Sequence, residues 1–178
     1  GAYFQLQSFV FRPVFGINNA VLAISAFNYG ARKPERITAV LRWGITYSCT
    51  LMAIGMAVFL LIPETLLGIF NPDPLMRTVG IPALRIMCLP FIPAGMSIMC
   101  SGVFQALDRS IFSMIVSISR QLLVLIPAAY LLSLSGNIDA VWLSYPIAEV
   151  VSLLITVVLM ISLYRKKIRP LAQQPLEN

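Results

Sequence analysis

Long apolar stretches alternate with short polar connections along the whole chain. A membrane core about 30 Å thick requires about 20 apolar residues in a helix, and five stretches are long enough: 4–29, 39–62, 79–106, 111–134 and 140–163. Barrel strands would show alternation over roughly 10 residues instead. We therefore predict an all-α membrane protein, in which residues 1–164 form a bundle of five transmembrane helices and residues 165–178 form a basic cytoplasmic tail.

Basic residues gather in every second connection between these stretches. They are Arg32, Lys33 and Arg36 after the first stretch, Arg109 after the third, and Arg165, Lys166, Lys167 and Arg169 after the fifth. The other two connections hold few basic residues. Cytoplasmic loops carry the excess of Lys and Arg. We expect a multi-pass protein of the plasma or inner membrane with a cytoplasmic C-terminus.

Proline and capping residues refine the predicted ends and bends. Pro34 suits the first turn of a helix, and Asp139 is the expected N-cap of the fifth span. Six prolines fall inside spans, where each removes a backbone donor and can bend the helix: Pro13, Pro82, Pro90, Pro93, Pro127 and Pro146. A short interfacial segment is expected within 63–78.

Composition excludes several classes of protein. Of the 178 residues, 58% are hydrophobic and 11% charged, against roughly 25% charged in ordinary globular domains. The net charge of +6 comes from clusters at span ends, which favours a lipid partner over nucleic acid. The chain has no His, and its three Cys lie apart in apolar runs. We therefore expect no metal site and no cofactor, and the absence of P-loop, dinucleotide or hydrolase motifs indicates that the protein is not an enzyme.

The first span carries a polar and small-residue stripe. Residues at three- and four-residue spacing share one face of a helix, and here they are Gln5, Ser8, Arg12, Gly16, Asn19, Ala23 and Ala26. The stripe should face an interior that is either closely packed or filled with water.

The fourth and fifth spans each carry a second polar stripe. One consists of Ser113, Ser117, Arg120 and Gln121, and the other of Tyr145, Glu149, Ser152 and Thr156. Counted from the connection between the spans, Arg120 and Glu149 differ in depth by about one helical turn, or ~5.4 Å. We predict a buried ion pair, because a charge left alone in the bilayer costs at least about 2.5 kcal/mol. The pair either serves structure alone or makes Glu149 a proton-accepting or cation-attracting group tuned by Arg120.

Three short motifs carry a resemblance to a known family. Residues 13–20 read Pro-Val-Phe-Gly-Ile-Asn-Asn-Ala, residues 28–32 read Asn-Tyr-Gly-Ala-Arg, and Glu35-Arg36 follow. A proline-rich third span then reaches Gly-Val-Phe-Gln-Ala at 102–106. This order resembles helices eight to twelve of the MATE multidrug and toxic-compound extrusion transporters, over essentially the whole chain.

The resemblance implies a twelve-helix transporter of two six-helix lobes, of which this chain would form most of the second. Such multidrug efflux antiporters export organic, often cationic, compounds in exchange for H⁺ or Na⁺ by alternating access. The partners would then be the missing N-terminal lobe of the same polypeptide, the bilayer and small organic substrates. The coupling ion would bind largely outside this part. Some relatives place a carboxylate in the tenth helix, whereas 79–106 contains no Asp or Glu.

Seven residues are the candidates for function. Those expected to line a substrate cavity are Arg12, Asn18, Asn19, Gln121 and Tyr145, and those expected to form the ion pair or bind the coupling ion are Arg120 and Glu149. Two alternatives remain open. A lipid-linked saccharide flippase would use Arg12, Arg85 and Arg120 for a phosphate-bearing lipid, and a non-transporting membrane module would only bind or assemble partner subunits.

Overall fold

The chain is entirely helical wherever the computed structural model describes regular structure, in residues 2–70 and 73–171. The elements are α1 (Ala2–Gly30), α2 (Pro34–Leu61), α3 (Pro63–Gly68), α4 (Pro74–Met87), α5 (Phe91–Ala106), α6 (Ser110–Ile118), η1 (Ser119–Leu125), α7 (Ile126–Ser133), α8 (Ile138–Trp142), α9 (Ser144–Leu163), η2 (Tyr164–Ile168) and α10 (Arg169–Leu171). The predicted all-α class is confirmed. Half of the expected basic tail, 172–178, lies outside the described residues, and the other half, 165–171, continues the last long helix as η2 and α10 rather than beginning a separate tail.

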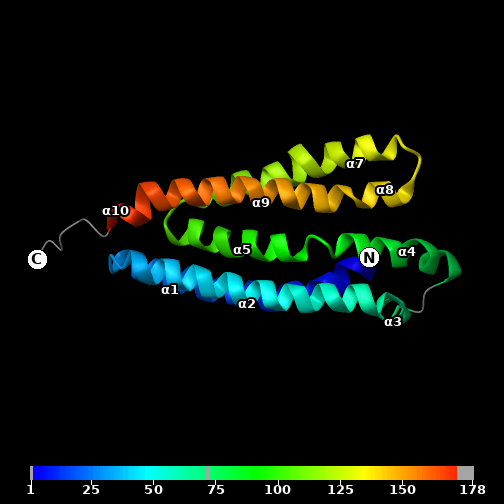
Figure 1. Ribbon diagram of the computed structural model, residues 1–178, viewed down its shortest axis with the longest axis horizontal. Coiled ribbons are helices and arrows are strands. Elements are labelled where there is room, and N and C mark those ends of the chain that lie inside the picture. Colours follow the sequence, from blue (N-terminus) through cyan, green and yellow to red (C-terminus); the bar gives the residue numbers. More distant parts are fainter. Residues whose placement is uncertain (1, 71–72, 172–178) are drawn as a thin grey trace, which may run out of the picture.

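Four helical segments of the described chain are long and apolar enough to cross a membrane. They are Tyr3–Gly30, Pro34–Leu61, Ser110–Ser133 and Ile138–Leu171. The bent pair α4 and α5 makes a fifth if it counts as one span. Successive spans run antiparallel along the length of the molecule (Figure 1).

The third span is not the single helix over 79–106 that we expected from the sequence. It begins at Pro74 and breaks between Met87 and Phe91, where the two halves meet at 50°. The break coincides with Pro90, which has no N–H group to donate to the carbonyl four residues earlier, while Pro93 lies in the first turn of α5, where a helix needs no such donor. Pro13, by contrast, lies inside an uninterrupted α1.

Helix α5 is the centre of the bundle. It contacts α1 and α2, which also contact each other, and it contacts α9 on its other side. Small residues permit this close approach: an added Cβ at Gly95 would lie 2.6 Å from Ser48 Oγ, and one at Gly102 would overlap Oδ1 of Asn18. Close packing through small residues is a common means of joining helices in membranes.

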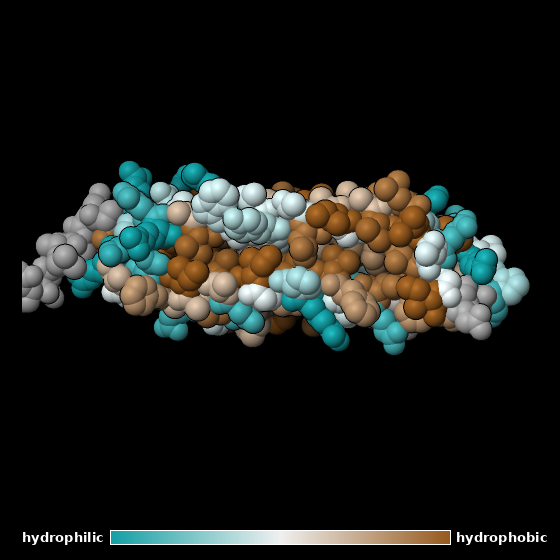
Figure 2. Space-filling model, turned by 90° about the horizontal axis from the view of Figure 1, so that it is seen from below, coloured by the Kyte–Doolittle hydropathy of each residue, from teal (hydrophilic) through white to brown (hydrophobic). Residues whose placement is uncertain are grey.

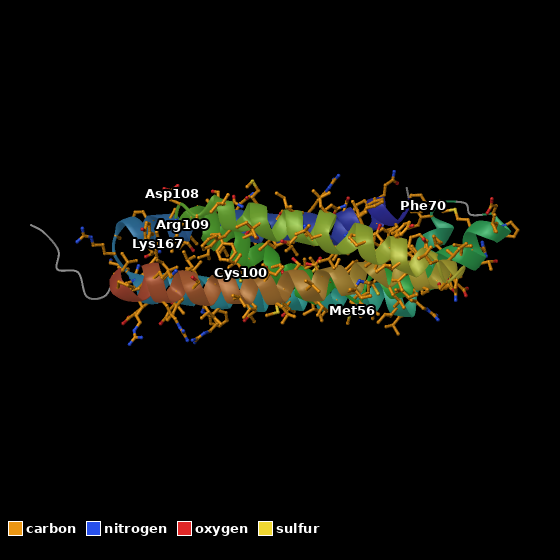
Figure 3. The ribbon with its side chains drawn as sticks, turned by 90° about the horizontal axis from the view of Figure 1, so that it is seen from above. Met56, Phe70, Cys100, Asp108, Arg109 and Lys167 are labelled. Carbon is orange, nitrogen blue, oxygen red and sulfur yellow. The ribbon has the colours of Figure 1, made fainter. Side chains whose placement is uncertain are left out.

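The ends of the molecule are polar and the surface between them is mainly apolar. Figure 3 places Asp108, Arg109 and Lys167 together at one end and Phe70 at the opposite end. The basic connections that the sequence groups on one side therefore share one end of the bundle. On the face shown in Figure 2, hydrophobic side chains cover much of the surface between the two polar ends, as a protein embedded in lipid requires.

Of the two residues expected at the starts of helices, one lies where the sequence predicted and one does not. Pro34 does occupy the first turn of α2, but Asp139 is not the cap of the last span. The cap is Asn137, whose Oδ1 accepts a hydrogen bond from the backbone N of Asp139 at 2.9 Å, and Asp139 lies in the first turn of α8. Asn137 comes directly before the first turn, where an N-cap must lie.

Two wide π-helical turns, η1 and η2, each end two residues before a proline. The prolines are Pro127 and Pro170. A proline cannot donate to the carbonyl four residues earlier, and a wider turn lets that carbonyl meet the donor five residues later instead. Segment η1 carries Arg120 and Gln121, so this local distortion sets the direction of two candidate functional side chains.

Candidate functional site

A cavity of about 560 Å³ lies among α1, α5, the α6–η1 segment and α9. Helix α1 contributes a face of aromatic and amide side chains that includes Phe4, Gln7, Phe11, Phe15 and Asn18. These residues recur at intervals of three and four, which places them on one side of the helix.

The opposite walls of the cavity are more polar. Helix α5 contributes Ser97, Ser101 and Gln105, again one helical turn apart. The α6–η1 segment contributes Ser113, Ser117, Arg120 and Gln121. The Ser113 hydroxyl donates to the Ser101 carbonyl at 3.1 Å, so two of these walls are held together directly.

Helix α9 contributes Tyr145 and Glu149, while Ser152 and Thr156 continue the same face into the buried interior. The two predicted stripes thus meet at this cavity, although Ser117 and Gln121 are exposed at its open side. A membrane-embedded hollow with one polar side and one aromatic side can hold a molecule that has both characters.

The predicted ion pair between Arg120 and Glu149 is confirmed. One guanidinium nitrogen of Arg120 lies 3.4 Å from Oε2 of Glu149. The two side chains are 36% and 10% exposed, so the carboxylate is the more deeply placed partner. Its other oxygen, Oε1, is buried and has no hydrogen-bond partner. The site thus keeps a free acceptor that a proton or a cationic group can use.

The break between α4 and α5 forms part of the wall of the cavity. Met87, Pro90 and Phe91 all line it. The Tyr3 hydroxyl of α1 donates to the Met87 carbonyl at 3.2 Å, which gives one of the last carbonyls of α4 a partner. Phe91 packs edge-on against Phe11, with ring centroids 5.4 Å apart.

Five of the seven candidates line this cavity, and two do not. Asn18, Gln121, Tyr145, Arg120 and Glu149 are brought together, whereas Arg12 and Asn19 are exposed and lie outside its walls. Each residue turns an α-helix by about 100°, so Asn19 points well away from its neighbour Asn18. The expectation that Arg12 and Asn19 line the same hollow is wrong for this cavity.

The small-residue stripe of α1 faces out of the described chain. Of its seven members only Ser8 lines the cavity, and the other six are exposed. The face that packs against the rest of the bundle is instead the opposite one, with Val14 and Val21 fully or almost fully buried.

Sequence reasoning missed the aromatic wall and the α5 wall. Tyr3, Phe11, Phe15 and Ser101 were not among the candidates, yet all line the cavity. Their three- and four-residue spacing was a usable signal. It was hidden because apolar aromatic residues on a membrane helix are equally typical of a lipid-facing surface.

The site offers little for a metal. The described residues contain no group of three or more His, Cys, Asp or Glu side chains that could hold an ion. Glu149 is the one acidic residue among those that line the cavity, so a monovalent ion or a proton suits it better than a divalent metal.

Comparison with known proteins gives this geometry a family context. The family model for MatE matches residues 1–131. The chain is 25% identical over 154 residues to a FAD transporter of Shewanella oneidensis, covering 84% of this chain and 33% of the relative. It is also 25% identical over 164 residues to the multidrug export protein MepA of Staphylococcus haemolyticus, covering 92% of this chain and 36% of the relative. The chain spans about a third of the length of these curated relatives.

Solved structures agree with the sequence relatives. The chain is similar to the MATE multidrug transporter DinF-BH, with a TM-score of 0.81 and 32% identity over 92% of this chain and 36% of that one. It shares its fold with the inward-facing form of a multidrug resistance MATE family transporter, at a TM-score of 0.85 and 19% identity over 97% of this chain and 39% of that one. The outward-facing form gives the same TM-score of 0.85.

Proposed function

Because the chain belongs to the MatE family, we propose that it is part of a secondary active transporter that exports organic, often cationic, compounds in exchange for H⁺ or Na⁺. The chain spans 39% or less of the relatives described above. The whole activity therefore belongs to a longer assembly, in which these helices correspond to the eighth to twelfth of twelve. The exposed stripe of α1, including Arg12 and Asn19, then remains available to the other part of the transporter.

The observation that carries the proposal is a buried carboxylate with a free oxygen beside a cavity of substrate size. Arg120 holds Oε2 of Glu149 and leaves Oε1 without a partner. An ionised Glu149 attracts a cationic substrate. When a proton or a sodium ion binds the same group, that attraction is lost and the substrate can leave. Competition for one carboxylate is the simplest physical basis for exchange of the two cations.

The arrangement of the helices is consistent with alternating access by movement of whole lobes. The described bundle matches the inward-facing and outward-facing forms of a MATE family transporter at the same TM-score of 0.85. This is the result expected if these helices keep their mutual packing while the lobe rotates against its partner. The basic end of the bundle, with Arg109 and Lys167, would lie on the cytoplasmic side.

The test uses the full-length transporter reconstituted in proteoliposomes, with ethidium as the transported cation and an imposed pH or Na⁺ gradient. We expect Glu149→Gln to lower gradient-driven ethidium transport at least tenfold, because the neutral side chain can no longer exchange one cation for another. Glu64→Gln is the matched control, since Glu64 is exposed on α3 and does not line the cavity.

Two results would contradict the proposal. Equal gradient dependence in Glu149→Gln and Glu64→Gln would remove Glu149 from the coupling step. No gradient-driven transport of ethidium or of other organic cations by the wild-type protein would remove the transport function itself.

A further inference from the structure

A second, smaller hollow adjoins the polar cavity at the end of the bundle opposite the basic connections. It has a volume of about 230 Å³ and is lined by residues of α1, α3, α4, α8 and α9. Of these elements, α3, α4 and α8 gather at the same end of the molecule (Figure 1). Its walls away from the cavity are mostly apolar, and include Leu67, Met76 and Ala83.

The two hollows share a wall of four residues. Tyr3, Phe4, Met87 and Tyr145 line both of them. The Tyr3 hydroxyl donates a hydrogen bond to the Met87 carbonyl. The Tyr3 ring packs edge-on against Phe59, with centroids 6.5 Å apart. This wall is thus held in place from two sides, and a molecule in the large cavity has the small hollow directly beside it.

The distance from the carboxylate to the shared wall is short. Tyr145 precedes Glu149 by four residues on α9, which is about 6 Å along the helix axis. A cation held at Glu149 therefore lies about one helical turn from the residues that line both hollows. In another protein, an apolar cavity of about 150 Å³ is large enough to bind benzene, so 230 Å³ accommodates a short alkyl chain or a single aromatic ring.

We propose that this hollow is an apolar subsite that binds the tail of a substrate whose cationic head is held at Glu149. The inference rests on the proposed transport function and narrows its substrate class to amphipathic cations with a short apolar extension. Each methylene added to the alkyl chain should increase binding affinity until the hollow is full, and further methylenes should not increase it.

The experiment measures how strongly n-alkyltrimethylammonium ions, from methyl to octyl, compete with ethidium efflux by the full-length transporter. For the wild-type protein we expect the half-inhibitory concentration to fall by about fourfold per methylene and then level off. In Ala83→Leu, whose larger side chain fills the hollow, we expect the curve to level off earlier. Each variant is compared with its own tetramethylammonium value.

A second variant changes the volume in the other direction. Met76→Ala enlarges the hollow from the α4 side, so the plateau should move to longer chains. Thr78→Leu is the matched control on the same helix, because Thr78 is exposed and lines neither hollow. Longer chains also concentrate in the bilayer, but they do so equally for every variant. A difference in plateau between Met76→Ala and Thr78→Leu therefore reports on the hollow alone.

The outcomes separate this inference from the function on which it rests. Plateaus at the same chain length in Ala83→Leu, Met76→Ala and Thr78→Leu would overturn the subsite, and would favour a lipid chain as the occupant, while transport itself remained. Absence of ethidium efflux in the wild-type protein would instead contradict the transport function.

Discussion

The Lys167 ammonium donates a hydrogen bond to the Leu107 carbonyl at 3.0 Å, across 60 residues of sequence. The same nitrogen lies 5.4 Å from the centre of the Tyr29 ring. Lys167 therefore connects the last long helix to the end of α5 and to the end of α1. All three meet at the basic end of the bundle (Figure 3).

Replacing this lysine should loosen that end of the bundle. Leu107 follows α5, where the helix leaves its last carbonyls without helical partners. We expect Lys167→Met, which keeps an apolar stem, to lower the free energy of unfolding by about 1.5–3 kcal/mol, the range for a hydrogen bond to a charged group. Thermal unfolding of the purified full-length protein measures the change. Lys166→Met is the control, because Lys166 is the exposed neighbour of Lys167. Equal effects of the two substitutions would show that the contact of Lys167 with the Leu107 carbonyl does not stabilise the fold.

A side chain at Gly102 should displace the Asn18 amide from its place between α1 and α5. A Cβ at this position would overlap Oδ1 of Asn18 and lie 3.4 Å from the Asn18 carbonyl oxygen. We expect Gly102→Ala to destabilise the protein by about 1–3 kcal/mol, as overpacking of a close helix contact does. Gly68→Ala is the control, because nothing lies within 4 Å of an added Cβ there. The same melting experiment decides, and an unchanged midpoint for Gly102→Ala would mean that the Asn18 amide can move aside without cost.

The two partners of the ion pair should not contribute equally to stability. Glu149 is 10% exposed and Arg120 is 36% exposed, so removing the arginine leaves the less solvated charge alone. We expect Arg120→Gln to cost about 1–2 kcal/mol, and Glu149→Gln to cost less, because the remaining guanidinium can reach solvent. A double-mutant cycle on unfolding free energies measures the coupling. Additive effects would mean that the 3.4 Å contact carries no energy.

Several parts of the fold could be predicted from the sequence because they depend on local chemistry. A stretch of about 20 apolar residues must form a helix in lipid, and the long helices overlap the predicted stretches. The possibility of a bend at Pro90 follows from its missing backbone donor, although the same donor is missing at Pro13 inside the unbroken α1. The pairing of Arg120 with Glu149 follows from similar depth in two adjoining spans and the cost of a lone charge in the membrane.

Other features depended on packing between distant segments. Asn18 and Asn19 are adjacent amides of equal chemistry, and nothing local distinguishes them. Asn18 lines the cavity because Val14 and Val21 turn one face of α1 against its neighbours and Gly102 leaves room for the amide. The same rotation turns Arg12 and Asn19 outward.

The sequence by itself determined that this chain is a set of membrane-spanning helices with basic residues at one end and a buried ion pair between two spans. These properties follow from hydropathy, charge and helical spacing, which act within a single helix or between neighbours. Only the tertiary structure decided which face of α1 meets the cavity and which residues of α1, α4 and α9 line both the polar hollow and the apolar one. Those outcomes depend on the rotation of each helix about its axis, and that rotation is set by contacts between residues far apart in the chain.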